Sequence, residues 1–396
     1  MSSAVPDGWE IKPLGEMTDV INGRAYKLTE WEDFGVPVIR LQNLTQKGGS
    51  FYYSNLKLPE KQYCHHGDLL FMWSASFGPY IWWGNKAIFH YHIWKMIPQE
   101  TKLNKTFLYF YLSQKTQEWK INTSGMAMQH LTKSGIESQE LITPPLPEQK
   151  KIASILTSVD EVIENTQKQI DKLQDLKKAT MNELLTKGIG HTEFKDSELG
   201  RIPKSWEVKC IDDVIKFSGG AQPPRSSFIF TPREGYVRLL QIRDYKSDRF
   251  ATYIPEKLSR RNCNEDDVLI GRYGPPIFQI LRGKSGSYNV ALIKSEPRND
   301  SLLKGYMYHF LTRADLFHLI DSLSQRTSGQ TGIDLGALKS FGFPFPPIEE
   351  QHRILEILDH MNASIKRLCN KLSQTQSLKK SLMQDLLTGK VRVTVN

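Results

Sequence analysis

The sequence predicts an α+β protein built from two copies of one unit, each copy a globular α+β domain followed by a long helix. Two observations lead to this prediction. The phrase PPLPEQKKIASIL at 144–156 returns as PPIEEQHRILEIL at 346–358, and LKKATMNELLT at 176–186 returns as LKKSLMQDLLT at 378–388. Within both copies, apolar residues recur at alternating spacings of four and three, which is the seam of a coiled coil. A repeat at one fixed offset indicates a duplicated building block.

The globular parts repeat more faintly. Segments 6–26 and 203–223 each open on a proline followed by a Trp-Glu pair, and CHHGDLLF at 64–71 aligns with CNEDDVLI at 263–270. In each copy, short β-like runs broken by Gly and Pro come first, and a helical stretch then precedes a Thr-Ser-Gly loop. The predicted order is a globular domain at 1–143, a helical spacer at 144–188, a connector at 189–202, a globular domain at 203–345 and a helical spacer at 346–390.

The two spacers are expected to pair with each other. Proline pairs at 144–145 and 346–347 mark where the helices begin, and Gly188 and Gly389 mark where they end. One apolar stripe on a long helix has to be covered, and antiparallel pairing covers both stripes while holding two domains apart. The alternative is that each helix packs on its own domain. The expected pairing residues are Ile152, Leu156, Val159, Ile163, Ile170, Leu173, Ile354, Leu358, Met361, Ile365, Leu368 and Leu372.

Composition and charge indicate the class of protein and the kind of partner. No apolar run is long enough to span a membrane, and the N-terminus lacks the pattern of a signal peptide. Four scattered cysteines, none in a CxxC pair, fit a reducing cytoplasm. The chain has a net charge of +9, which fits a polyanionic partner. The excess is uneven, because the first globular domain carries +1 and the second +6.

At this point the chain resembles the specificity (S) subunits of type I restriction–modification systems. The resemblance rests on the PPLPEQ and PPIEEQ phrases, the segment IGHTEFKDSELGRIPKSWEV at 189–208, the Trp-Glu pairs and the Thr-Ser-Gly loops. It implies two target recognition domains, each reading one half of a split, asymmetric site on double-stranded DNA. It also implies that the paired helices set the spacer and dock two methyltransferase (M) subunits, which carry S-adenosylmethionine and methylate adenine at N6. Restriction (R) subunits then join through them.

Nothing in the sequence indicates that this chain is itself an enzyme or holds a cofactor or metal. The string YGPPIF at 273–278 lacks the Asn or Asp of an adenine methyltransferase loop, and GKS at 283–285 lacks the upstream glycine of a phosphate-binding loop. His65–His66 and the pair His90 and His92 do not have helical metal-ligand spacing. Two alternatives stay open: a single-chain DNA-modifying enzyme and a coiled-coil protein scaffold.

Candidate DNA contacts lie at strand ends and in loops, where Arg, Gln, Asn, Ser and Thr can reach base edges. Aromatic residues at 73–83 could stack on DNA, although Trp82 and Trp83 are also typical of a core. Paired lysines on the helices, among them Lys177, Lys178, Lys379 and Lys380, fit either symmetric docking of a partner or a solvated face. The candidates are Arg40, Gln42, Asn43, Trp73, Ser74, Ser76, Tyr80, Gln129 and His130 in the first copy, and Gln241, Arg243, Asp244, Arg272, Tyr273, Arg326, Gln330 and Thr331 in the second.

Overall fold

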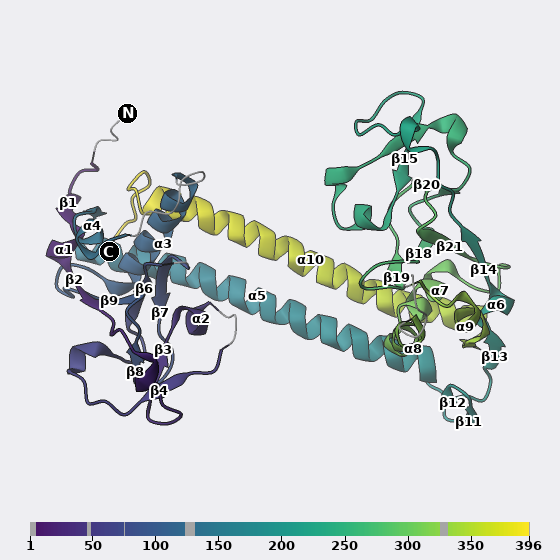
Figure 1. The fold of residues 1–396 in the computed structure, drawn as a ribbon, viewed down its shortest axis with the longest axis horizontal. Helices are drawn as coiled ribbons and strands as arrows, with labels where there is room; N and C mark the ends of the chain where they lie inside the picture. The colour runs from purple at the N-terminus through teal and green to yellow at the C-terminus, as the bar shows by residue number, and fades with distance from the viewer. Residues whose placement is uncertain (1–4, 46–48, 75, 123–130, 325–331, 396) are drawn as a thin grey trace. The chain divides into compact units, whose positions relative to one another are not determined.

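The computed structural model describes residues 5–45, 49–74, 76–122, 131–324 and 332–395. The chain forms two compact units, each of which is described here by itself (Figure 1). The first unit comprises Met1–Lys168 and Cys369–Asn396, and the second comprises Gln169–Leu368. Each unit therefore contains one globular domain together with part of both long helices.

The first globular domain is built on three sheets. A two-stranded sheet pairs β1 (Glu10–Pro13) with β10 (Glu140–Thr143), which brings the two ends of the domain together. One four-stranded sheet has the order β2-β9-β6-β7 (Thr18–Asn22, Ile93–Pro98, Leu69–Met72, Gly78–Ile81). The other has the order β4-β3-β8-β5 (Tyr52–Ser54, Val36–Ile39, Ala87–Phe89, Tyr63–Cys64). Its helices are α1 (Leu14–Met17), α2 (Leu41–Leu44), α3 (Lys105–Asn122) and α4 (Lys133–Glu137).

The second globular domain repeats this topology strand for strand. Strand β13 (Glu207–Cys210) pairs with β22 (Gly342–Phe345), and the sheets have the orders β14-β21-β18-β19 and β16-β15-β20-β17. The strands of the first of these sheets are β14 (Ile215–Gly219), β21 (Leu292–Pro297), β18 (Val268–Gly271) and β19 (Gln279–Leu281). Those of the second are β16 (Tyr253–Pro255), β15 (Tyr236–Leu240), β20 (Gly286–Tyr288) and β17 (Asn262–Cys263). Its helices are α6 (Ile211–Val214), α7 (Lys304–Leu311), α8 (Ala314–Ser324) and α9 (Leu335–Ser340). The connector adds a hairpin of β11 (Phe194–Ser197) and β12 (Gly200–Pro203).

The helical stretch before the second Thr-Ser-Gly loop consists of two helices. In the first domain the stretch forms one helix, α3, but in the second it is broken between α7 and α8. At the break, the buried Arg313 turns its guanidinium to the Leu185 carbonyl at 3.4 Å and to the Asp315 carboxylate at 2.5 Å. The predicted helical stretch is therefore present in the second domain as two consecutive helices.

The spacers form the long helices α5 (Leu146–Lys187) and α10 (Ile348–Leu386), which confirms the two predicted spacer helices. In the first unit, Ile152 and Leu156 near the start of α5 share a core with Leu386 and Leu387 at the end of α10. In the second unit, Leu184 and Leu185 at the end of α5 share a core with Ile354 and Leu358 near the start of α10. The beginning of one helix thus lies beside the end of the other in each unit, which is the antiparallel arrangement predicted.

All of the predicted pairing residues are buried or half-buried, and the seam contains a residue that the apolar pattern did not indicate. Ile152, Leu156, Ile170, Ile354 and Leu358 are buried; Val159, Ile163, Leu173, Met361, Ile365, Leu368 and Leu372 are half-buried. Between Ile163 and Ile170, the buried Thr166 continues the spacing of three and four. Its hydroxyl donates to the Val162 carbonyl at 2.7 Å, so this buried polar group is satisfied within its own helix. In the part of the chain that the structure describes, no helix has the length and apolarity that crossing a membrane requires.

Candidate DNA-recognition faces and the helix junctions

The repeated phrase places one buried carboxylate at the start of each long helix. In the first unit, the Glu148 carboxylate accepts hydrogen bonds from Nε and Nη2 of Arg392, each at 2.8 Å. Arg392 also donates to the Asp7 carbonyl at 2.7 Å and lies 5.8 Å from the Trp9 ring. Burial by itself raises the pKa of Glu148, but the hydrogen bonds and charge of Arg392 outweigh it and hold that pKa below its usual value. Glu148 therefore fastens the start of α5 to the tail that follows α10.

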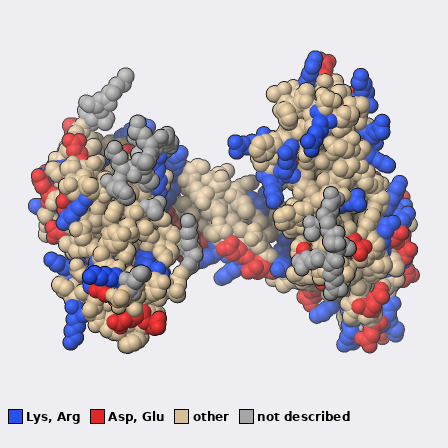
Figure 2. Space-filling view, in the orientation of Figure 1, with Lys and Arg blue, Asp and Glu red and all other residues tan. Residues whose placement is uncertain are grey.

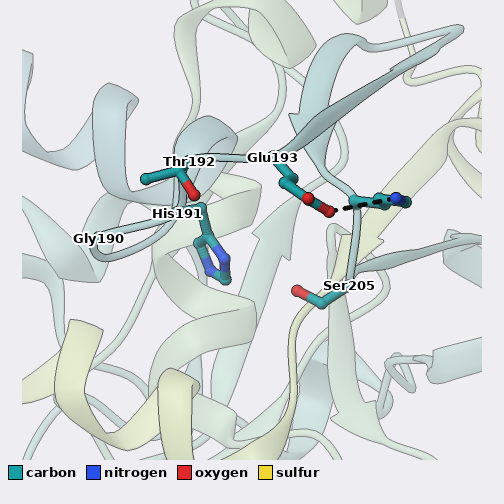
Figure 3. A pocket seen from close by; sticks show the side chains of 6 residues that line it. Gly190, His191, Thr192, Glu193 and Ser205 are labelled. Carbon is teal, nitrogen blue, oxygen red and sulfur yellow. Dashed lines mark hydrogen bonds and ion pairs between the residues drawn. The ribbon is translucent and has the colours of Figure 1, made fainter.

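The second unit contains the equivalent junction with different partners. Oε1 of Glu350 accepts from the Ile189 amide at 2.9 Å and contacts Nε2 of His191 at 2.8 Å, while Oε2 accepts from Nε1 of Trp206 at 2.8 Å. Gly188 has a φ of +67°, and a side chain there would collide with the Glu350 carboxylate and the Trp206 ring. His191 thus occupies the place of Arg392, and its ring also borders an open hollow of about 450 Å³, across which Ser205 lies (Figure 3).

The glutamine that follows each of these glutamates has the same task in both units. Gln149 accepts from the Asn104 amide at 2.8 Å and donates to the Lys102 and Pro144 carbonyls, each at 2.9 Å. Gln351 makes the corresponding bonds with the Leu303 amide and with the Ser301 and Pro346 carbonyls, at 2.9–3.0 Å. The structure shows that the Glu-Gln pair joins each spacer helix to its domain.

The first domain presents an aromatic surface edged by arginines. Trp31 lies between Tyr26 and Tyr52, with ring centroids 4.7 Å apart on each side, and 5.9 Å from His90. Arg24 lies 4.3 Å from the Tyr26 ring centroid and Arg40 lies 4.0 Å from that of Tyr52. Burial, together with the charges of His92 and Arg40, lowers the pKa of His90 to about 4, so this ring is neutral at pH 7. Stacked rings beside guanidinium groups are a surface suited to nucleotides.

Of the predicted DNA-contact residues in the first domain, Arg40 lies on this aromatic surface, and the side chains of the others make contacts within the domain. Asn43 is committed to the local fold, because its Oδ1 accepts from the Arg40 amide at 2.9 Å and its Nδ2 donates to the Gly49 carbonyl at 3.0 Å. Gln42 turns its amide oxygen to the Arg40 guanidinium. Trp73 donates its indole N–H to the Tyr91 carbonyl at 2.8 Å and stacks on Trp94. Ser74, Ser76 and Tyr80 are half-buried in or beside β7.

The two tryptophans that follow β7 have different environments. Trp82 is buried, and its indole N–H donates to the Asn85 carbonyl at 2.8 Å. Trp83 is 65% exposed, and its ring packs against that of His66 at 5.3 Å. The core interpretation is therefore correct for Trp82 and wrong for Trp83. Two adjacent residues of an extended segment point in opposite directions, which explains the difference.

The second domain presents a basic surface. The exposed Arg243 and Arg249 lie 5.7 and 5.4 Å from the ring of Phe250, which is itself 54% exposed. Nearby, Asp248 pairs with Arg238 at 2.5 Å and Lys284 at 2.6 Å, and these bonds lower its pKa to about 2. Figure 2 shows Lys and Arg gathered over the part of the second unit that carries β15 and β20. This cluster was only partly indicated by sequence, because Arg249 and Phe250 lie outside the repeated segments.

Of the predicted DNA-contact residues in the second domain, some are bonded within the fold and Arg272 is exposed. Asp244 is fully buried; burial raises its pKa, and its Oδ2 accepts from the Gln241 amide at 2.6 Å. Asp244 thus performs the turn-capping task of Asn43. The Gln241 side chain donates to the Thr252 hydroxyl at 3.2 Å. Arg272 is exposed and lies 5.4 Å from the Tyr273 ring, and Tyr273 pairs with Gly332. The loop candidates Gln129, His130, Arg326, Gln330 and Thr331 lie outside the described residues.

Comparison with known proteins agrees with this architecture. A family model described as "Type I restriction modification DNA specificity domain" matches residues 6–175 and again 203–375. The chain is 28% identical to the MjaVIII specificity subunit of Methanocaldococcus jannaschii, with 98% of this chain and 94% of that one covered. It is 25% identical to the EcoBI specificity subunit of Escherichia coli, with 98% and 87% covered.

Solved structures share the fold at lower sequence identity. The crystal structure of a type I restriction–modification S subunit from M. genitalium is 14% identical and has a TM-score of 0.56, with 97% of each chain covered. A structure from work on complex assembly in the type I R-M system is 17% identical and has a TM-score of 0.62, with 98% of this chain and 100% of that one covered. With the family model matched twice along its length, the chain belongs to the type I restriction–modification DNA specificity family and is a specificity subunit.

Proposed function

We propose that each globular domain reads one half of an asymmetric, two-part site on double-stranded DNA. The observation that carries this proposal is that two domains of identical strand order display different surfaces. Stacked aromatic rings edged by Arg24 and Arg40 mark the first domain, and exposed arginines around Phe250 mark the second. Equivalent positions carry different chemistry, as Trp73 and Arg272 do. Different side chains on one scaffold select different bases, because base edges are distinguished by donor and acceptor pattern.

The long helices would set the gap between the two half-sites. Their antiparallel pairing, and the junctions at Glu148 and Glu350, support a spacer of defined length. DNA-binding proteins with two reading heads recognise half-sites at a spacing that their own geometry sets. The chain's role in this proposal is recognition, with no catalytic residue and no cofactor of its own.

The repeated outer face of the helices would bind two copies of one partner, a methyltransferase subunit. Leu176 on α5 and Leu378 on α10 occupy equivalent positions of the repeat and are 57% and 53% exposed. Exposed leucines flanked by lysines in both copies are suited to docking amphipathic partner helices. The partner would carry S-adenosylmethionine and methylate adenine at N6, and restriction subunits would join the assembly through it.

The test is methylome sequencing of a host that expresses this chain with its methyltransferase partner. We expect methylated adenines within one split motif that has two dissimilar halves and a constant gap. Replacing residues 203–345 by the corresponding domain of a relative should change one half and leave the other half and the gap intact. A swap that alters both halves, or a site without a gap, would contradict the proposal.

A second measurement addresses the alternative of a single-chain modifying enzyme. The isolated chain is titrated with S-adenosylmethionine in a calorimeter, and no saturable heat is expected. Micromolar binding by the chain alone would favour the alternative.

A further inference from the structure

The second unit contains a basic cavity that the recognition function does not use. Its volume is about 370 Å³, and it lies where the end of α5, α7 and the first half of α10 meet (Figure 1). Lys177 and Lys178 line it from α5, Thr312 follows α7, and Asn362 lines it from α10. Met181 and Ile365 supply apolar walls. The cavity thus combines two cations with neutral hydrogen-bonding groups in a partly enclosed space.

At the equivalent position of the first unit, a carboxylate of the chain itself pairs with the lysine. The repeat aligns Lys177 with Lys379 and Asn362 with Asp160. Lys379 forms an ion pair with Asp160 at 2.6 Å, and its ammonium group lies 5.4 Å from the ring of Phe110. In the first unit, therefore, a carboxylate from α5 neutralises the lysine of α10.

Two changes among the residues at the two positions alter charge or polarity, and a third lies nearby, because Asp359, aligned with Thr157, acts electrostatically on His309. Asp160 is replaced by Asn362, which removes the negative charge, and Phe110 is replaced by His309. His309 is buried; burial and the charge of Lys177 lower its pKa to about 4, so at neutral pH it adds no charge of either sign. Among the residues that the structure describes, Lys177 and Lys178 form no ion pair. Lys177 keeps the position of Lys379 but has lost the carboxylate that balances it.

We propose that this cavity binds one anionic oxygen group, a phosphate or a carboxylate, in the place that Asp160 holds in the first unit. The ammonium groups of Lys177 and Lys178 supply charge-assisted hydrogen bonds, which are stronger than those between neutral groups. The Asn362 amide can add a neutral donor, whereas the Thr312 hydroxyl already donates to the His309 carbonyl at 2.8 Å. A site enclosed on its apolar side by Met181 and Ile365 screens this charge less than open solvent does. Anion binding at this cavity would not require that either domain recognise DNA.

The test uses the full chain and follows thermal unfolding with sodium phosphate, sodium acetate or sodium chloride at matched ionic strength. We expect phosphate at tens of millimolar to raise Tm by about 2 °C over chloride in the wild-type chain. Asn362→Asp rebuilds the carboxylate of the first unit, so the chain should gain stability in chloride and lose the response to phosphate. Asp160→Asn is the matched variant, because it should create a second responsive position and enlarge the shift.

The result that would overturn the proposal is an identical phosphate response in the wild type and in Asn362→Asp, since general salt effects act equally on both. Lys177→Met gives an independent reading, because it removes the central cation without adding a carboxylate and should also abolish the response. Acetate separates the possible ligands. A shift with acetate equal to that with phosphate points to a carboxylate, such as an acidic side chain of another protein, and a shift with phosphate alone points to a phosphate group.

Discussion

The two junctions that fasten the long helices hold the same carboxylate by different means. Glu148 faces an arginine that follows α10, whereas Glu350 is held by His191, a backbone amide and the indole N–H of Trp206. The glutamines beside them, Gln149 and Gln351, make matching bonds in both units. A duplicated sequence motif can therefore keep its structural role while the residues that bind it diverge. What has to persist is a buried acceptor, and any set of donors that satisfies it maintains the junction.

The largest expected effect comes from removing the carboxylate that accepts from the fully buried Trp206 indole. Glu350→Ala leaves the buried Trp206 N–H and the Ile189 amide without an acceptor and should lower the free energy of unfolding by about 3–5 kcal/mol. Glu148→Ala should cost clearly less, because the side chain of its partner Arg392 is 44% exposed and regains water. Urea denaturation measures both, with the exposed Glu349→Ala as the control at about 0.5 kcal/mol or less. Equal losses at Glu350 and Glu148 would remove the distinction between the junctions.

The second effect is a pH dependence to which His309 of the second unit contributes, as His90 of the first unit also does. The folded pKa of His309 is about 4, below the value of about 6.5 expected when unfolded, so the unfolded state binds the proton more readily. Its contribution to stability is complete above pH 6.5 and is lost as pH falls from 6.5 through 4, by up to about 3 kcal/mol.

His309→Phe installs the first-unit residue Phe110 and should reduce the fall in unfolding free energy over that range, while His90 keeps its own contribution. Lys177, Arg282 and Asp359, the other charged groups that act on this histidine, stay in place. A pH profile that is unchanged in His309→Phe would show that other groups govern the acid response.

A smaller effect is expected at the glycine that closes α5. Gly188→Ala combines a left-handed backbone with a collision against Glu350 and Trp206, and it should cost about 2–3 kcal/mol. Gly190→Ala is the matched control, because its φ is also left-handed at +71° while nothing lies within 4 Å of the added methyl group. That control should cost about 1 kcal/mol. Thermal unfolding of the two variants separates collision from backbone strain, and equal losses would argue against the close contact.

The smallest expected effect lies in the helix seam. Thr166→Val replaces a buried hydroxyl, bonded only to its own helix, by a methyl group of the same shape. Because an apolar side chain is favoured at a seam position, the variant should be about 0.5 kcal/mol more stable. Val159→Thr, the reverse change at another seam position, should destabilise. If Thr166→Val also destabilised the chain, the hydroxyl would have a role beyond its bond to Val162.

Much of the architecture follows from local pattern. The proline pairs, the alternating spacing of apolar residues and the closing glycines predicted α5 and α10, because helix periodicity and termination are properties of short segments. The antiparallel pairing followed from the need to cover both seams. Thr166 was missed because a polar residue interrupts the apolar pattern.

The residues of the candidate DNA-contact surfaces could be predicted less well from local sequence pattern. Arg40, Arg243 and Arg272 lie on or beside exposed surfaces, but Asn43 and Asp244, chosen for their place at a strand end, cap turns. The cluster of Tyr26, Trp31, Tyr52 and His90 joins three separate segments of the first domain, and no periodic spacing in the sequence connects them.

The sequence by itself determined that this protein is a duplication: two domains of one topology and two helices with complementary seams. Only the tertiary structure decided why the repeated phrase contains Glu-Gln, which residues form each surface, and that Lys177 lacks the carboxylate that Lys379 has. The physical reason is distance along the chain. Periodicity acts between residues three or four apart, whereas Glu148 and Arg392, 244 positions apart, meet only because two long helices return the chain to its starting domain.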